Sequence, residues 1–244
     1  MKTAFFLFYE ELNDFLPAAK KKRRFEHSFT GSPSVKDMIE SIGVPHVEID
    51  LILISGKSIG FNYHVKNKDD ISVFPVFETF DISDIQHLRA KPLPEPKFVL
   101  DVHLGKLAKY MRMLGFDTLY ETNYTDEQIV EIASKEKRTI LTKDLGILKR
   151  NGVTHGYWVR SKNSEEQVKE IIERFDLRNE IKELTRCLEC NGLLQKVEKE
   201  KVLNRLPEKV KQYQEEFFRC SNCDKIYWKG SHHSEMLKLI PKLT

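Results

Sequence analysis

Four cysteines, arranged as two CxxC pairs, constrain this chain of 244 residues more than any other feature. Cys187 and Cys190 form the first pair, Cys220 and Cys223 form the second, and 29 residues separate the pairs. Four thiolates suit tetrahedral Zn²⁺ with no open coordination position, which is typical of structural sites. Redox-active CxxC pairs are the alternative, but neither pair opens a helix after a strand. The spacing predicts a zinc ribbon, and the stretch LPEKVKQYQEEF between the pairs predicts an inserted helix.

Strand and helix patterns alternate in the region before the cysteines. Each predicted strand is followed by a predicted helix, and the pairs are 98–101 with 103–114, 117–121 with 126–136, 139–144 with 145–150, and 155–160 with 164–175. Such alternation predicts a compact α/β domain with a parallel sheet covered by helices. The sequences TDEQ, from Thr125, and SEEQ, from Ser164, both fit the capping box that starts a helix.

The first third of the chain has a different pattern. Strands are predicted at 3–12, 23–31, 50–61 and 71–77, and one helix is predicted to start at Ser34 and stop at Gly43. Three prolines fall within five residues after this part and predict a linker. The predicted organisation is therefore a small β-rich domain at 1–80, a linker at 81–97, an α/β domain at 98–184, and a zinc ribbon with a tail at 185–244.

Three acidic residues follow predicted strands of the α/β domain, namely Asp101, Asp126 and Asp144. The carboxyl ends of parallel strands meet at one edge of a sheet, where ligands bind. Carboxylates gathered there repel one another unless a hard cation such as Mg²⁺ or Mn²⁺ bridges them. The alternative role is helix capping for Asp101 and Asp144, and a favourable interaction with the helix dipole for Asp126, with Glu127 as the nearby alternative ligand.

Basic and aromatic residues near these acids suggest a nucleic-acid substrate. Lys106, Lys143, Lys149 and Arg150 could hold a phosphate backbone. After the second CxxC pair, Trp228 and Lys229 could stack on a base and neutralise a phosphate. The alternative is that Trp228 and its neighbour Tyr227 only cover the small core of the ribbon.

The order of elements in residues 3–78 resembles the β-grasp fold of ubiquitin-like sulfur carriers. Those carriers work through a free C-terminal Gly-Gly tail, whereas Phe77 continues here into a further domain. The resemblance therefore implies the fold without the carrier chemistry. Two roles remain open, namely a module that docks a protein partner or positions substrate, and a packing appendage with no ligand.

The stretches FVLDVHLGKLAKYMRMLGFDT, TDEQIVEIA, RTILTKDLGILKR and THGYWVRS, followed by CLECNGLL and CSNCDKIYWKGSH, resemble the Mut7-C RNase family. This family is a branch of the PIN-like ribonucleases, and the resemblance covers about residues 97 to 235. It implies a metal-dependent ribonuclease in which Asp101, Asp126 and Asp144 hold Mg²⁺ or Mn²⁺, with RNA as the substrate. The alternatives are an RNA-binding or adaptor protein whose acids do not support cleavage, and a toxin-like endonuclease.

The composition favours a chain that stays in water. No apolar run approaches the roughly 18 residues of a membrane helix, and the first residues, MKTAFFLFYEELNDFLP, do not resemble a signal peptide. Cysteines placed for metal and not for disulfides suggest the cytoplasm. The net charge of +3 permits an acidic partner such as RNA without requiring one.

Overall fold

The structure, a computed structural model, describes residues 1–75 and 95–244 and divides into two compact units. The first unit comprises 1–94 together with 144–158, and the second comprises 95–143 together with 159–244. Residues 81–94 of the predicted linker, and the last two residues of the strand predicted at 71–77, lie outside the described residues. Among the described helices, none has the length and apolar character needed to cross a membrane.

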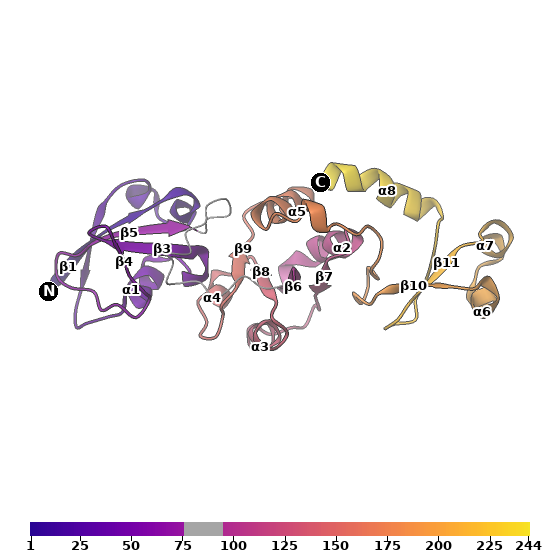
Figure 1. Cartoon of the computed structure of the whole chain (residues 1–244), viewed down its shortest axis with the longest axis horizontal. Coiled ribbons are helices and arrows are strands. Elements are labelled where there is room, and N and C mark those ends of the chain that lie inside the picture. Colours follow the sequence, from indigo (N-terminus) through magenta and orange to yellow (C-terminus); the bar gives the residue numbers. More distant parts are fainter. Residues whose placement is uncertain (76–94) are drawn as a thin grey trace. The chain divides into compact units, whose positions relative to one another are not determined.

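A mixed five-stranded sheet forms the core of the first unit (Figure 1). The strand order is β2-β1-β5-β3-β4, and β1 pairs in parallel with β5 whereas the other neighbours are antiparallel. The strands are β1 (Lys2–Phe8), β2 (Phe25–Phe29), β3 (Ile49–Ile54), β4 (Lys57–Ser58) and β5 (Asp70–Pro75). The predicted β-grasp fold is confirmed.

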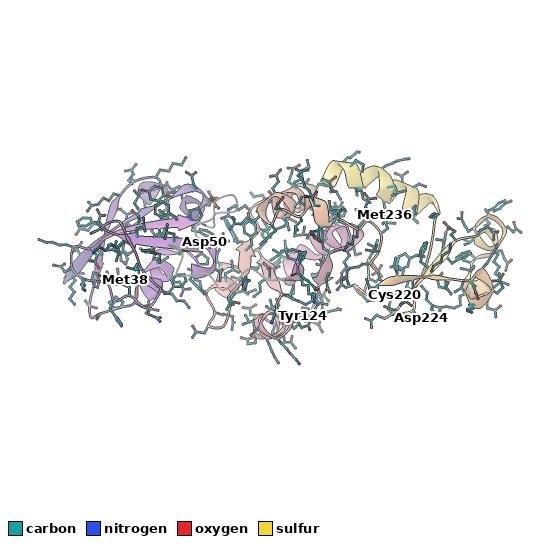
Figure 2. The ribbon with its side chains drawn as sticks, viewed as in Figure 1. Met38, Asp50, Tyr124, Cys220, Asp224 and Met236 are labelled. Atoms are coloured by element: carbon teal, nitrogen blue, oxygen red, sulfur yellow. The ribbon has the colours of Figure 1, made fainter. Side chains whose placement is uncertain are left out.

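Helix α1 (Val35–Ile42) packs on this sheet because its apolar residues recur on one face. The Ser34 hydroxyl accepts a hydrogen bond from the backbone N–H of Asp37 at 3.1 Å, and Gly43 ends the helix with a φ of 127°. Both predicted ends are therefore confirmed. Met38, labelled in Figure 2, lies in the core with residues of β1, β3 and β5.

The first predicted strand was too long. It ends at Phe8, and the short 3₁₀ helix η1 (Glu10–Phe15) follows. The Asn13 side chain donates to the carbonyls of Phe8 at 2.8 Å and Glu10 at 3.0 Å, which closes the chain into a turn. Two further 3₁₀ helices in this unit are η2 (Ala18–Lys20) and η3 (His46–Glu48). The segment 144–158 contributes α4 (Leu145–Leu148) and β9 (Gly156–Trp158).

A parallel sheet lies at the centre of the second unit. Strand β6 (Lys97–Leu100) pairs in parallel with β7 (Asp117–Leu119) and with β8 (Thr139–Thr142), and Leu100 lies opposite Leu141. The other elements of this part are η4 (Val102–Leu104), α2 (Gly105–Met113), α3 (Asp126–Glu136), α5 (Ser164–Arg174) and η5 (Arg178–Glu180). The predicted parallel-sheet α/β fold is confirmed.

The two predicted capping boxes have different outcomes. Thr125 caps α3, and its side chain and that of Gln128 form the reciprocal pair of hydrogen bonds. Helix α5 instead begins after Asn163, whose side chain accepts a hydrogen bond from the N–H of Glu165 at 2.8 Å. The prediction of Ser164 as the cap was wrong, because Asn163 is an equally good cap one residue earlier.

The cysteine-containing part is a three-stranded antiparallel sheet with inserted helices. Its strands are β10 (Leu194–Val197), β11 (Phe217–Cys220) and β12 (Ile226–Trp228), and its helices are α6 (Lys199–Val202), η6 (Leu203–Arg205), α7 (Glu208–Tyr213) and α8 (Ser231–Leu243). Val202, Leu206 and Phe217 form a small core between the sheet and the inserted helices. Helix α7 lies within the predicted helical stretch, whereas α8 was not predicted.

Candidate functional site

The four predicted zinc ligands lie together in the second unit. Cys187 and Cys190 precede β10, whereas Cys220, labelled in Figure 2, ends β11 and Cys223 follows it. Their sulfur atoms all lie within 4.8 Å of one another, with 3.6 Å between Cys187 and Cys223 and 3.3 Å between Cys190 and Cys220. A tetrahedral zinc ion with bonds of about 2.3 Å places its sulfur ligands about 3.8 Å apart. The cluster fits a zinc ribbon and can hold a metal ion such as zinc.

The pKa values of two cysteines in the cluster are shifted in opposite directions. Burial opposes ionisation of Cys190, but the backbone hydrogen bond with Gly192 and contacts with the other thiols lower its pKa to about 7. Burial, and after it the contacts with the other three cysteines, raise the pKa of Cys223 to about 12. One thiolate in the cluster therefore opposes the formation of a second, and a bound metal ion would remove this conflict by displacing the protons.

Two neighbours shape the surroundings of the sulfur atoms. Gly192 has no side chain, and a Cβ at this position would lie 2.7 Å from the sulfur of Cys220. The Tyr227 hydroxyl lies 3.0 Å from the sulfur of Cys187 and accepts a hydrogen bond from the N–H of Leu188 at 3.3 Å. Burial and then Cys187 raise the pKa of Tyr227, so its hydroxyl keeps the proton that it can donate to sulfur. The sequence did not predict this contact.

Arg112 of α2 joins the first cysteine pair to the parallel sheet. Its side chain donates to the carbonyls of Leu188 and Glu189, which lie between Cys187 and Cys190, at 3.0 Å and 2.7 Å. It also donates to the carbonyl of Thr118 in β7 at 2.9 Å. The residue is only 3% exposed, and burial lowers its pKa. Arg112 stands between Met111 and Met113, and a charged residue within such an apolar run was the one signal that could have identified it.

A second buried connection runs through Asn191. Its amide donates to the carboxylate of Asp117 at 2.8 Å, and its carbonyl oxygen accepts from the backbone N–H of Thr118 at 2.9 Å. Asp117 also pairs with Arg138 at 2.6 Å and with Arg186 at 3.5 Å. Burial opposes ionisation of Asp117, but hydrogen bonds from Arg138 and Asn191 outweigh it and lower the pKa. The ribbon and strand β7 therefore share one network of buried polar groups.

Replacing Arg112 with methionine is expected to weaken both the fold and metal retention. The change leaves four carbonyls without a charged donor, those of Thr118, Tyr120, Leu188 and Glu189. Each buried carbonyl left without a partner costs about 1–3 kcal/mol. We expect the free energy of unfolding to fall by about 3 kcal/mol or more, and a chelator to remove zinc faster. Chemical denaturation and chelator competition measure the two effects.

The matched control is Lys109→Met, an exposed position of the same helix. Arg112→Lys should rescue only part of the loss, since one ammonium group lacks the planar fork that reaches separate carbonyls. Wild-type stability and wild-type zinc retention in Arg112→Met would show that the network does not support the ribbon.

Asp101 is a buried cap with little carboxylate surface left. It directly follows β6 and is 3% exposed. Its Oδ2 accepts hydrogen bonds from the Thr142 hydroxyl and, at 2.6 Å, from the N–H of Lys143, whereas its Oδ1 accepts from the N–H of His103 at 2.8 Å. Two bonds fill the two lone pairs of Oδ2. Oδ1 accepts one hydrogen bond, so it is the carboxylate oxygen that keeps a lone pair for a further ligand.

The other two predicted acids stand at helix starts. Asp126 is the first residue of α3 in the second unit and is half-buried, and Thr125 does the capping there. Asp144 caps α4 through a 2.7 Å hydrogen bond from the N–H of Gly146, and its side chain is exposed. Asp144 belongs to the first unit. Over residues 1–75 and 95–244, the group of three or more metal-ligating side chains that lie together is the four cysteines.

The predicted phosphate-binding residues differ in their surroundings. Lys106 is exposed and lies 5.4 Å from the ring of Tyr110. The amine of Lys143 donates to the carbonyls of Arg160 and Ser161, and burial lowers its pKa. The amine of Lys149 donates to the carbonyl of Glu40 at 3.1 Å, and Arg150 is half-buried.

Trp228 and Lys229 have structural partners of their own. Trp228 packs against the small core of the ribbon, and Lys229 pairs with Glu216 at 2.5 Å. A cavity of about 340 Å³ nevertheless runs along both residues and reaches Met236 of α8, which is labelled in Figure 2. Their role in substrate binding stays a prediction.

Comparisons with known proteins identify both parts of the chain. The family model described as Mut7-C RNAse domain matches residues 96–240, and the model described as Mut7-C ubiquitin matches residues 1–81. No curated protein and no solved structure matches the chain.

Proposed function

Because the chain belongs to the Mut7-C RNAse domain family, we propose that it is a metal-dependent ribonuclease that hydrolyses phosphodiester bonds of RNA. The observation that carries this proposal is the match of the family model over residues 96–240, which covers the α/β part and the cysteines together. An RNase family implies RNA as the substrate. The match over residues 1–81 gives the same family context for the first part of the chain.

The proposed catalytic residues are Asp101, Asp126 and Asp144. Asp101 retains room at Oδ1, and Asp144 exposes its carboxylate one residue beyond Lys143, whose N–H contacts Asp101. Carboxylate oxygens are the ligands that Mg²⁺ and Mn²⁺ prefer. Such an ion, when bound, would activate water and stabilise the leaving oxygen. The proposed contacts to RNA are Lys106, Lys143, Lys149, Arg150, Trp228 and Lys229.

The proposed role of the cysteine cluster is structural. Cys187, Cys190, Cys220 and Cys223 would fill all four positions of a tetrahedral zinc ion. A closed site of this kind leaves no position for substrate or water, so that zinc would stabilise the ribbon without taking part in cleavage.

An RNA-binding or adaptor protein without cleavage is the second candidate. The filled Oδ2 of Asp101, together with the backbone contacts made by the amines of Lys143 and Lys149, favours this reading. Binding of Mn²⁺ in addition to zinc separates the candidates, because only the nuclease requires a second kind of metal site.

Purified protein is expected to cleave RNA in Mg²⁺ or Mn²⁺ and to lose this activity in EDTA, since the carboxylates alone cannot activate water. Gel analysis of labelled single-stranded RNA measures the result. Activity should return on addition of Mg²⁺ or Mn²⁺ but not of zinc alone, which is the control for loss of the structural ion. Cleavage that persists in EDTA would contradict the metal-dependent mechanism, and RNA binding without cleavage would establish the adaptor.

A further inference from the structure

The first unit contains a piece of the nuclease region. Residues 144–158 fall inside the match of the Mut7-C RNAse domain, yet they belong to the same compact unit as residues 1–75. The segment starts at Asp144, a proposed metal ligand, and contains α4 and β9. The contacts that the ubiquitin-like part makes with residues 144–158 suggest what the ubiquitin-like part does.

The C-terminal end of the segment is held by Glu48. The carboxylate of Glu48 accepts a hydrogen bond from the backbone N–H of Trp158 at 2.7 Å, and Glu48 is 1% exposed. The ring of Phe15 lies 5.2 Å from the ring of Trp158. A buried carboxylate needs hydrogen-bond donors, and the Trp158 amide supplies one of them.

The middle of the segment is held by His46. One ring nitrogen lies 2.6 Å from the Glu40 carboxylate, and the other lies 3.0 Å from the carbonyl of Val153, a buried residue of the segment. The two ring nitrogens therefore face one partner each, and the ring links helix α1 to the segment.

A third contact lies near the beginning of the segment. The amine of Lys149 donates to the backbone carbonyl of Glu40 at 3.1 Å. Glu40 thus has its side chain on His46 and its carbonyl on Lys149. The three contacts, at 149, 153 and 158, span two thirds of the segment.

The segment needs such support because its own elements are short. Helix α4 has four residues and β9 has three. Fixing the backbone of one residue costs about 1–2 kcal/mol of conformational entropy, and a single helical turn does not recover this cost in water. Tertiary contacts therefore contribute to the order of residues 144–158, and the contacts with the ubiquitin-like part described above are among them.

We propose that the ubiquitin-like part acts as an internal clamp that orders residues 144–158 and thereby positions Asp144 for metal binding. The ordering of residues 144–158 is inferred from the hydrogen bonds described above. The effect on catalysis rests on the proposed ribonuclease function. Glu48, His46 and Lys149 are positioning residues in this scheme. Loss of the clamp in Glu48→Ala is expected to lower kcat and to change KM for RNA little, whereas a domain that positions substrate would affect KM.

Glu48→Ala in the full-length protein is the first test. Hydrogen exchange of amides in residues 144–158 should accelerate at least tenfold, and exchange of α3 should stay unchanged. Glu48→Gln, which keeps an acceptor oxygen for the Trp158 amide, should restore most of the protection. Glu26→Ala, at an exposed position of strand β2 in the same unit, is the matched control.

Lys149→Met is the second test, because Lys149 is half-exposed and its replacement does not endanger the core. It should also accelerate exchange in residues 144–158, whereas Lys57→Met, an exposed lysine of the same unit, should not. If exchange in the segment stays within twofold of wild type in both Glu48→Ala and Lys149→Met, the clamp is refuted. Hydrogen exchange does not depend on cleavage, so an inactive wild-type protein would refute the proposed function alone.

Discussion

Replacing Cys187 or Cys220 with serine is expected to abolish tight zinc binding and to unfold the ribbon. A serine hydroxyl is a poor zinc ligand, and the small core of Val202, Leu206 and Phe217 is too limited to hold the ribbon by itself. Structural zinc contributes on the order of 10 kcal/mol to small domains that depend on it. Elemental analysis should find about one zinc ion per wild-type chain and nearly none in the variants.

Loss of zinc is also expected to destabilise strand β7 of the parallel sheet. Arg112, Asn191 and Asp117 connect the first cysteine pair to β7, so loss of zinc should accelerate hydrogen exchange in residues 117–120 as well. Ser221→Ala, an exposed neighbour of Cys220, is the control. Wild-type protein without zinc, or serine variants with unchanged thermal unfolding, would exclude the structural zinc site.

Asp144→Asn is expected to reduce RNA cleavage by about 100-fold or more while leaving the protein folded. The amide removes the charge that the metal ion requires, and losses of this size follow when one stabilising group is removed from a preorganised site. The side chain is exposed, and asparagine caps a helix about as well as aspartate, so the free energy of unfolding should change by less than about 1 kcal/mol. Cleavage rates in Mn²⁺ and denaturation measure both.

Asp101→Asn should reduce both activity and stability. One of the two carboxylate oxygens becomes an NH₂ group. The backbone N–H groups of His103 and Lys143 and the Thr142 hydroxyl all donate to this carboxylate, so at least one hydrogen bond is lost and two donors face each other. We expect a destabilisation of about 2–3 kcal/mol. Asp126→Asn should cost less activity, and Asp176→Asn, an exposed residue of the second unit, is the control. Full activity of Asp144→Asn in Mn²⁺ would remove Asp144 from the catalytic residues.

Local patterns predicted the elements whose causes are local. Helix α3 has the predicted bounds because Thr125 and Gln128 lie in sequence where a capping box needs them. The cysteine cluster was predictable because four residue types and their spacing define it. Asp101 shows the limit, since its position after a strand fits both a metal ligand and a cap. Only the two donors to Oδ2, which are 41 and 42 residues away in the chain, show that this oxygen is already used.

The sequence patterns did not predict contacts between residues that are far apart in the chain. Arg112 reaches carbonyls 76 and 77 residues away, and no residue type marks a backbone carbonyl as a partner. The packing of 144–158 with the ubiquitin-like part was missed for the same reason, because His46 and Lys149 use backbone carbonyls as acceptors. Helix α8 was missed because its first residues, SHHS, lack a strong capping pattern.

The discontinuous first unit has a consequence for how such proteins can evolve by gene fusion. A fusion event copies a continuous stretch of sequence, and residues 1–81 could be transferred or exchanged in one step. The compact unit also includes residues 144–158, which such a transfer would leave behind in the other gene. An exchanged copy would have to present a carboxylate equivalent to that of Glu48 to the backbone amide of Trp158. The two stretches are therefore expected to be inherited together.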